Sequence, residues 1–215
     1  MAKFAFIQNL AYEYLGTMYL SSLLQKDGHA IEVFIENKAR IKKLVQEVAG
    51  FKPDIVGFYC STGMHHWVLQ TARFLKSRFP DTKIILGGPH ATFFPEVIKE
   101  SCVDIICRGE GEFALQELLH RIERNEDYTN VANLWAKKDG DVFRNEVRPL
   151  IKDLDSLLFP DRQLYARKYP SLIKSQKVFI TGRGCPYSCT FCFNASLKNL
   201  YKEKAAIVLF SNCLS

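Results

Sequence analysis

Three cysteines close together in the last part of the sequence, Cys185, Cys189 and Cys192, are the residues best suited to chemistry. Their thiolates are soft ligands, which suit both iron–sulfur clusters and zinc. A cubane cluster has four corners, so three cysteines would leave one iron open to bind a substrate. Gly182 and Gly184 would let the backbone pass close to such a cluster, because glycine has no side chain. The spacing therefore favours an open iron–sulfur site.

Zinc is the main alternative for the same thiols. Structural zinc usually draws on two separated Cys or His pairs. Cys213 is the only other cysteine in the C-terminal part of the sequence, and no second pair is found there. A zinc site stays open as a less favoured interpretation.

The residues around the cysteines read Gly-Cys-Pro-Tyr-Ser-Cys-Thr-Phe-Cys, from Gly184 to Cys192. This stretch resembles the signature of radical S-adenosylmethionine (radical SAM) enzymes, including the aromatic residue before the last cysteine. The resemblance implies a [4Fe–4S] cluster whose open iron holds the amino and carboxylate groups of S-adenosylmethionine, which an electron from the cluster cleaves to a 5′-deoxyadenosyl radical. It also implies that Phe191 packs near the adenine, although plain core packing is the alternative for that side chain.

The first 125 residues alternate between strand-like and helix-like hydrophobic patterns. Such βα units in succession predict an α/β fold, with a five-stranded parallel sheet of the Rossmann-like, flavodoxin-like kind and helices on both faces. The expected strands are Lys3–Leu10, Ala30–Glu36, Asp54–Cys60, Lys83–Leu86 and Val103–Cys107. The expected helices are Thr17–Asp27, Ala39–Ala49, Val68–Phe79, Pro95–Glu100 and Leu115–Ile122.

Ligands of such sheets bind beyond the carboxyl ends of the strands, so the loops there indicate the ligand. The first loop contains Gly16 but no Gly-x-Gly-x-x-Gly, which disfavours a dinucleotide. The third strand lacks the terminal aspartate that a phosphorelay receiver needs. Small residues instead follow three of the strands, and they are Gly16, then Ser61, Thr62 and Gly63, then Gly87 and Gly88.

These small residues, in this order, resemble those of cobalamin (B12)-binding domains. Together with the cysteine motif they resemble the B12-binding radical SAM family over residues 1–200, including Arg108–Glu112 and Phe159–Arg162. The resemblance implies that the small residues let a corrin and its nucleotide tail approach the backbone. It also implies that Glu110 and Glu112 hydrogen-bond the tail, although favourable charge at a helix start is the alternative.

The first loop departs from the family's pattern. Aligned on Gly16, Glu13 stands where many cobalamin domains have the histidine that binds cobalt from below. We therefore expect base-off cobalamin without a histidine ligand from this loop. His65, His66 and His90 are nearby polar candidates, but each fits a helix start or a loop better.

The remaining sequence predicts a three-part organisation. Residues 1–128 form the cobalamin-binding domain, 129–176 a hairpin and linker, and 177–215 the start of a radical SAM β/α barrel whose first strand is Lys177–Thr181. Asp139-Gly140 suits a type I′ hairpin turn. Since the family's barrel needs roughly 200 residues, and the residues after Tyr201 do not resemble the family, we expect a chain truncated within that barrel.

Composition limits the partners. Residues 151–215 carry 10 Lys/Arg and 4 Asp/Glu, which accounts for the whole net charge of +6. These basic residues are scattered, which indicates a solvated surface around an anionic site, so no nucleic-acid partner is expected. No apolar run long enough to span a membrane and no signal peptide are found, and the seven cysteines are an odd number. A reducing, cytoplasmic location is therefore expected.

The function predicted from the resemblance is that of a cobalamin-dependent radical SAM enzyme, present as a fragment. Such enzymes carry out methyl transfer or tetrapyrrole-type cyclisation on a small-molecule substrate, with electrons from a donor such as flavodoxin or ferredoxin. The alternatives are a cobalamin-binding module without catalysis and a small zinc-binding α/β protein. The sequence identifies no catalytic residue.

Overall fold

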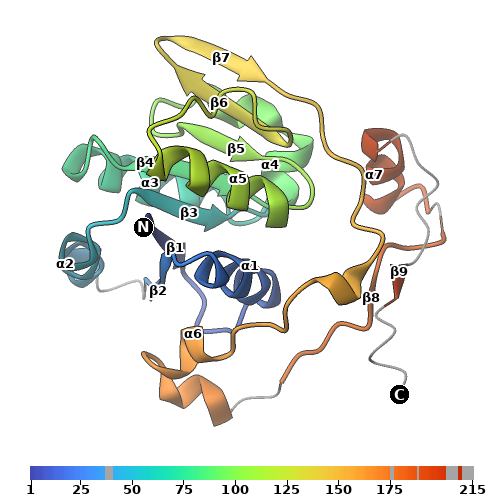
Figure 1. Cartoon of the computed structure of the whole chain (residues 1–215), viewed down its shortest axis with the longest axis horizontal. Helices are drawn as coiled ribbons and strands as arrows, with labels where there is room; N and C mark the ends of the chain where they lie inside the picture. Colours follow the sequence, from blue (N-terminus) through green and yellow to red (C-terminus); the bar gives the residue numbers. More distant parts are fainter. Residues whose placement is uncertain (37–40, 175–176, 188, 202–207, 210–215) are drawn as a thin grey trace.

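The computed structural model describes residues 1–36, 41–174, 177–187, 189–201 and 208–209. Its main sheet has the strand order β2-β1-β3-β4-β5-β6-β7 (Figure 1). The first five strands are parallel, and β6 and β7 are antiparallel additions. The flavodoxin-like order 2-1-3-4-5 confirms the predicted fold class. The strands are β1 Lys3–Gln8, β2 Ala30–Ile35, β3 Ile55–Tyr59, β4 Lys83–Gly87, β5 Ile105–Cys107, β6 Leu134–Lys138 and β7 Asp141–Arg144.

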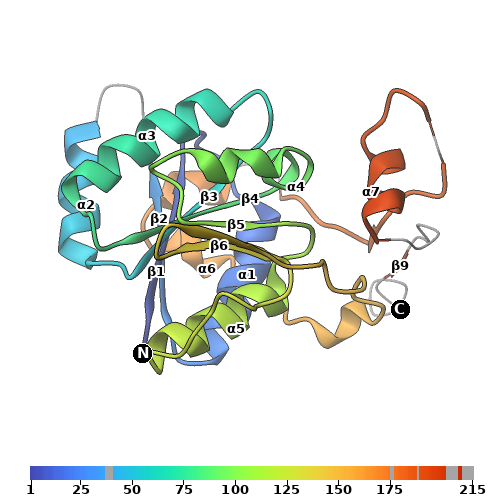
Figure 2. The ribbon, with the colours of Figure 1, turned by 90° about the horizontal axis from the view of Figure 1, so that it is seen from above.

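Helices cover both faces of the sheet, as Figure 2 shows. Helices α1 (Leu15–Lys26) and α5 (Glu112–Glu123) lie on one face, and α2 (Ile41–Phe51) and α3 (His65–Arg78) lie on the other. The short α4 (Pro89–Phe93) and the 3₁₀ helix η1 (Pro95–Lys99) connect β4 to β5. The five expected helices are thus found with shifted ends, except that residues 39 and 40 lie outside the described chain.

Alternating strand side chains build a separate core on each face. In β1, Phe4 and Phe6 face the core beneath α1 and α5, whereas Ala5 and Ile7 face the core beneath α2 and α3. This follows from the two-residue period of a strand. Because both faces are covered, the strands are almost continuously apolar.

The hairpin of β6 and β7 turns where the sequence predicts. Asp139 and Gly140 have φ values of 52° and 90°, the paired positive values of a type I′ turn. What the sequence did not indicate is that β6 pairs with β5, so the hairpin extends the main sheet.

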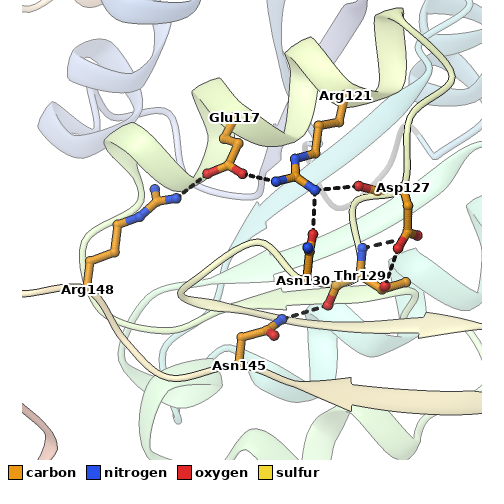
Figure 3. Close-up of polar contacts among 7 residues, drawn as sticks. All are labelled: Glu117, Arg121, Asp127, Thr129, Asn130, Asn145 and Arg148. Carbon is orange, nitrogen blue, oxygen red and sulfur yellow. Dashed lines mark hydrogen bonds and ion pairs between the residues drawn. The ribbon is translucent and has the colours of Figure 1, made fainter.

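A polar network fastens this hairpin to α5 (Figure 3). The carboxylate of Glu117 accepts hydrogen bonds from Arg121 and from Arg148, which follows β7. Asn145 Nδ2 donates to the Thr129 carbonyl at 2.8 Å. Residues 129–148 are therefore integrated with the first domain, although the predicted division at residues 128 and 176 stays a prediction.

The residues between the hairpin and the cysteines also pack on the sheet. They contain the short helices η2 (Leu154–Ser156), α6 (Gln163–Ala166) and η3 (Pro170–Lys174). Tyr165 is fully buried, and its hydroxyl donates to Gln8 Oε1 at 2.7 Å and accepts from the Tyr14 amide at 3.2 Å. This stretch is therefore not a free spacer.

The expected strand at Lys177–Thr181 is wrong. The chain there has no regular secondary structure and pairs with no strand of the described residues, and Phe179 is 76% exposed. The nearest strand is the two-residue β8 (Gly182–Arg183), which pairs antiparallel with β9 (Val208–Leu209). A barrel strand is held by parallel neighbours, and the described residues offer none to this stretch. The last described helix is α7 (Asn194–Tyr201).

None of the helices in the described ranges combines the length and apolar character that crossing a bilayer requires.

Candidate functional site at the carboxyl edge of the sheet

A cavity of about 510 Å³ opens at the carboxyl ends of β1, β3, β4 and β5. It lies between the first turns of α1 and α5 and extends down the sheet surface. Its floor is apolar and is formed by Phe4, Phe6, Gly57 and Ile85. Gly57 lets the floor form, because a β-carbon there would lie 2.4 Å from the ring of Phe4. A flat, mainly apolar group fits such a slot.

Five of the predicted cofactor residues line this cavity, and they are Gly16, Gly87, Gly88, Glu110 and Glu112. Three others, Ser61, Thr62 and Gly63, are not among its lining residues. They form the turn before α3, where the Ser61 carbonyl accepts the Met64 amide and Thr62 Oγ1 lies 3.2 Å from His90 Nδ1. Whether any of the eight binds a cofactor stays a prediction.

The structure needs glycine at different positions of the cavity for different purposes. A β-carbon at Gly16 or Gly87 would meet no atom within 4 Å, so these positions leave open space. Gly88 has φ +93°, and a β-carbon there would lie 2.9 Å from Tyr59 Cδ2. The fold itself therefore requires glycine at position 88, whereas Gly16 and Gly87 keep the cavity surface flat.

Two tyrosines that the sequence analysis missed also line the cavity. The rings of Tyr14 and Tyr59 lie with centroids 5.4 Å apart. Burial raises the pKa of both hydroxyls, so both stay protonated near neutral pH and can donate a hydrogen bond. Tyr59 is the last residue of β3, and this position at the carboxyl end of a strand could have indicated from the sequence that it lies at the cavity.

The first loop offers no free acid or histidine to a ligand. Glu13 is 5% exposed, and Lys177 Nζ lies 2.8 and 3.0 Å from its two carboxylate oxygens. The His65 ring stacks on the ring of His90 at 4.5 Å between centroids and packs at a tilt against the ring of His66 at 4.0 Å. None of the three histidines lines the cavity.

Glu110 and Glu112 both bind Arg183. Arg183 Nη1 donates to Glu110 Oε1 at 2.9 Å, and Arg183 Nη2 donates to Glu112 Oε1 at 2.6 Å. Glu110 Oε2 also accepts the Ile151 amide at 2.7 Å. Glu112 is the first residue of α5, where its charge is favourable. Sequence reasoning missed Arg183, although its position two residues before Cys185 could have indicated a role at this site.

The three clustered cysteines lie in a short loop next to this rim. Cys189 is exposed, Cys185 and Cys192 are half-buried, and the Cys192 amide donates to the Cys189 carbonyl at 3.1 Å. Phe191 is 92% exposed, so core packing does not explain an aromatic residue at this position. Accessible thiols in one tight loop suit a soft metal centre.

The other described cysteines are unsuited to metal binding. Cys60, Cys102 and Cys107 are buried, and burial raises the pKa of the Cys60 and Cys107 thiols to about 12. They are thus protonated at neutral pH, whereas a metal ligand must be a thiolate. Cys213 lies outside the described residues.

A second group of possible metal ligands, Asp27, His29 and His120, lies at the opposite end of the sheet. His29 Nδ1 accepts the Ala2 amide at 3.2 Å, which leaves the ring proton on Nε2. That nitrogen is a donor and not a lone pair aimed at a metal. This group therefore adds no support to the zinc interpretation.

The fold and the cavity together define an α/β cofactor-binding domain with an adjoining cysteine loop. Residues 10–119 match the family model described as B12 binding domain. The chain is 30% identical over 183 residues to an uncharacterized methyltransferase of Pyrococcus horikoshii, covering 83% of this chain and 40% of that protein. It is 31% identical over 185 residues to the anaerobic magnesium-protoporphyrin IX monomethyl ester cyclase of Rubrivivax gelatinosus, covering 81% and 33%.

Among solved structures, the cobalamin-dependent S-adenosylmethionine radical enzyme OxsB, with aqua-cobalamin and S-adenosylmethionine bound, superposes with a TM-score of 0.75. It is 22% identical, over 89% of this chain and 28% of that one. This likeness supports the fold. The chain belongs to the B12-binding domain family. It spans 40% or less of the length of these three proteins.

Proposed function

We propose that this chain supplies the cobalamin site and the cluster loop of a cobalamin-dependent radical SAM enzyme. The observation that carries the proposal is the cysteine loop beside the cavity, joined to it through Arg183, which lines the cavity two residues before Cys185. Two cofactors that act on one substrate must lie close together.

The cavity fits part of a cobalamin. Its volume of about 510 Å³ suits a nucleotide tail but is too small for a whole corrinoid. Phe4 and Phe6 would form the apolar floor under the tail, and Gly16 and Gly87 would keep the rim flat for the corrin. We propose that cobalamin binds base-off, because Glu13 replaces a lower histidine and is occupied by Lys177.

Cys185, Cys189 and Cys192 would hold a [4Fe–4S] cluster, with S-adenosylmethionine on its open iron and Phe191 near the adenine. When bound, these groups supply one-electron radical chemistry. The role of this chain's own residues is to bind and to orient: the thiolates hold the metal, and the protonated hydroxyls of Tyr14 and Tyr59 donate hydrogen bonds.

The reaction class follows from the relatives. We propose methyl transfer or a tetrapyrrole-type cyclisation on a small-molecule substrate, in the cytoplasm, with electrons from a flavodoxin or ferredoxin. The names of the two relatives above, a methyltransferase and a cyclase, support these two reactions.

Metal analysis tests the cluster. The chain is purified without oxygen and reconstituted with iron and sulfide. We expect about four irons per chain, against one zinc for the alternative site. The triple variant Cys185→Ala/Cys189→Ala/Cys192→Ala should lose the iron and the visible charge-transfer band. A parent chain that takes up zinc but no iron would overturn the cluster.

A cobalamin-binding module without catalysis is the second candidate, because the family model matches only residues 10–119. Equilibrium dialysis against hydroxocobalamin separates the possibilities. Retained corrinoid without an iron–sulfur cluster would favour the module, and absence of corrinoid under both oxidising and reducing conditions would remove both candidates.

A further inference from the structure

The segment that carries the cysteines, residues 177–201, is called here the cysteine segment. Its Arg183 bridges two carboxylates, that of Glu110 in the loop after β5 and that of Glu112 at the start of α5. Arginine presents its donors in a rigid planar fork, which suits two acceptors at once better than a lysine does. An extended chain covers at most about 3.6 Å per residue, so Cys185 stays within about 7 Å of the Arg183 backbone. Holding Arg183 in place therefore limits where the first cysteine can lie.

The other end of the cysteine segment reaches the same loop. The amide of Glu110 donates to Tyr201 Oη at 3.1 Å. Gly109, at φ +73°, makes room for this contact, because a β-carbon there would lie 2.0 Å from the Tyr201 hydroxyl. Tyr201 closes α7, which begins two residues after Cys192. Both flanks of the cysteines are thus held by residues 109–112.

The bridge is well shielded from water. The side chains of Glu110, Glu112 and Arg183 are 18%, 7% and 22% exposed. Removing the guanidinium would leave two carboxylates close together in a poorly hydrated wall, where like charges repel strongly. Pulling Arg183 away from the two carboxylates is therefore costly, which favours a single docked position of the segment.

Charge explains why the two parts recognise each other. The net positive charge of the chain lies in residues 151–215. In the structure, Lys177 pairs with Glu13 before α1, and Arg183 pairs with Glu110 and Glu112 at the start of α5. Complementary charge gives such a contact its register.

We propose that Arg183 is a positioning residue that docks the cysteine segment onto the rim of the cobalamin cavity, so that the cluster loop and the corrinoid site share one wall. The inference rests on the proposed function for the identity of the two cofactors, but the docking itself is a property of the chain without ligands. Cobalamin that packs against this wall would then stabilise the docked segment further.

Hydrogen–deuterium exchange of the whole chain, purified without oxygen, measures the docking. In Arg183→Met we expect backbone amides of the peptides around Cys185 and α7 to exchange about tenfold faster or more, since local opening becomes easier. Arg183→Lys should lie in between, because it keeps the charge without the fork. Arg167→Met is the matched control, since that side chain is exposed and lies away from the bridge, and it should behave as the parent chain.

Peptides of β1 and β3 report in the same experiment whether the sheet is intact. If Arg183→Met also loosens the sheet, the double variant Glu110→Gln/Glu112→Gln removes the bridge from the other side and gives the same readout. Faster exchange confined to the cysteine segment supports the proposal. Unchanged exchange of that segment in a variant with an intact sheet overturns it.

Hydroxocobalamin added to the same samples separates this inference from the proposed function. In the parent chain we expect bound hydroxocobalamin to slow the exchange of the peptide around Arg183, and in Arg183→Met this slowing should be lost. If the corrinoid binds to the parent chain without slowing that peptide, the shared wall is wrong. If the corrinoid does not bind at all, the cobalamin half of the proposed function fails, while the comparison without ligand still decides the docking.

Discussion

The ring of Tyr59 occupies the space that a side chain on residue 88 would need. A β-carbon built on Gly88 lies 2.9 Å from Tyr59 Cδ2 and 3.1 Å from the Cys60 carbonyl, in a backbone conformation with φ +93°. The next residue back, Gly87, has free space around the same point. Two adjacent glycines at the cavity therefore serve different purposes, one for the fold and one for the surface.

Gly88→Ala should destabilise the empty chain. With φ +93° and ψ −173°, Gly88 has a backbone conformation almost restricted to glycine, which costs a residue with a side chain about 1–3 kcal/mol, and the contact with Tyr59 adds to this. Urea unfolding followed by circular dichroism measures the loss. A variant as stable as the parent chain would contradict the assigned strain.

Gly87→Ala should keep the stability of the empty chain within about 0.5 kcal/mol, because the added methyl group meets no atom. It should weaken hydroxocobalamin binding, since the methyl group protrudes into the space proposed for the corrinoid. Equilibrium dialysis gives the dissociation constant. Gly50→Ala in α2 also has free space but lies outside the cavity lining, so its binding should match that of the parent chain. Equal binding by the Gly87→Ala variant would place the corrinoid elsewhere.

Bound cob(II)alamin should show no nitrogen superhyperfine splitting in its electron paramagnetic resonance spectrum. Glu13 stands where a lower histidine would be, and its carboxylate is paired with Lys177. Glu13→His tests the alignment, since a histidine there should introduce the splitting if the loop lies beneath the cobalt. A nitrogen triplet in the parent chain would refute base-off binding without a histidine.

Alkylation should distinguish the buried thiols from the clustered ones. At pH 8, iodoacetamide should modify Cys185, Cys189 and Cys192 while it spares Cys60 and Cys107, because burial raises the pKa of the latter two to about 12. Mass spectrometry of the peptides identifies the modified residues. Rapid modification of Cys60 or Cys107 in the folded chain would mean that they are not buried.

The same pKa values predict how stability depends on pH. The unfolded thiol loses its proton near its ordinary pKa of 9.0, whereas the folded thiols of Cys60 and Cys107 hold theirs to about 12. The unfolded chain therefore binds fewer protons between these values. The contribution of both thiols to stability is complete below pH 9 and decreases as the pH rises towards 12. Urea unfolding at pH 8 and pH 10 checks the sign, with Cys60→Ala/Cys107→Ala as the variant that should lose this part of the pH dependence.

Local patterns of the sequence determined most of the secondary structure and the chemical class of the chain. The βα alternation, the Asp139-Gly140 turn and the close spacing of Cys185, Cys189 and Cys192 can be read over a few residues, because periodicity and turn chemistry act locally. The small residues after the strands were enough to indicate the cofactor class.

Only the tertiary structure decided which side chains meet. It placed Tyr59 at the cavity and Ser61 outside it, although they are only two residues apart, because β3 ends at Tyr59 and the chain then turns into α3. It joined the hairpin to the sheet edge and left Lys177–Thr181 without a strand. It also brought Arg183 to Glu110, 73 positions away. Such contacts depend on how the elements pack and on which buried charges must be neutralised, and no local pattern of the sequence records either.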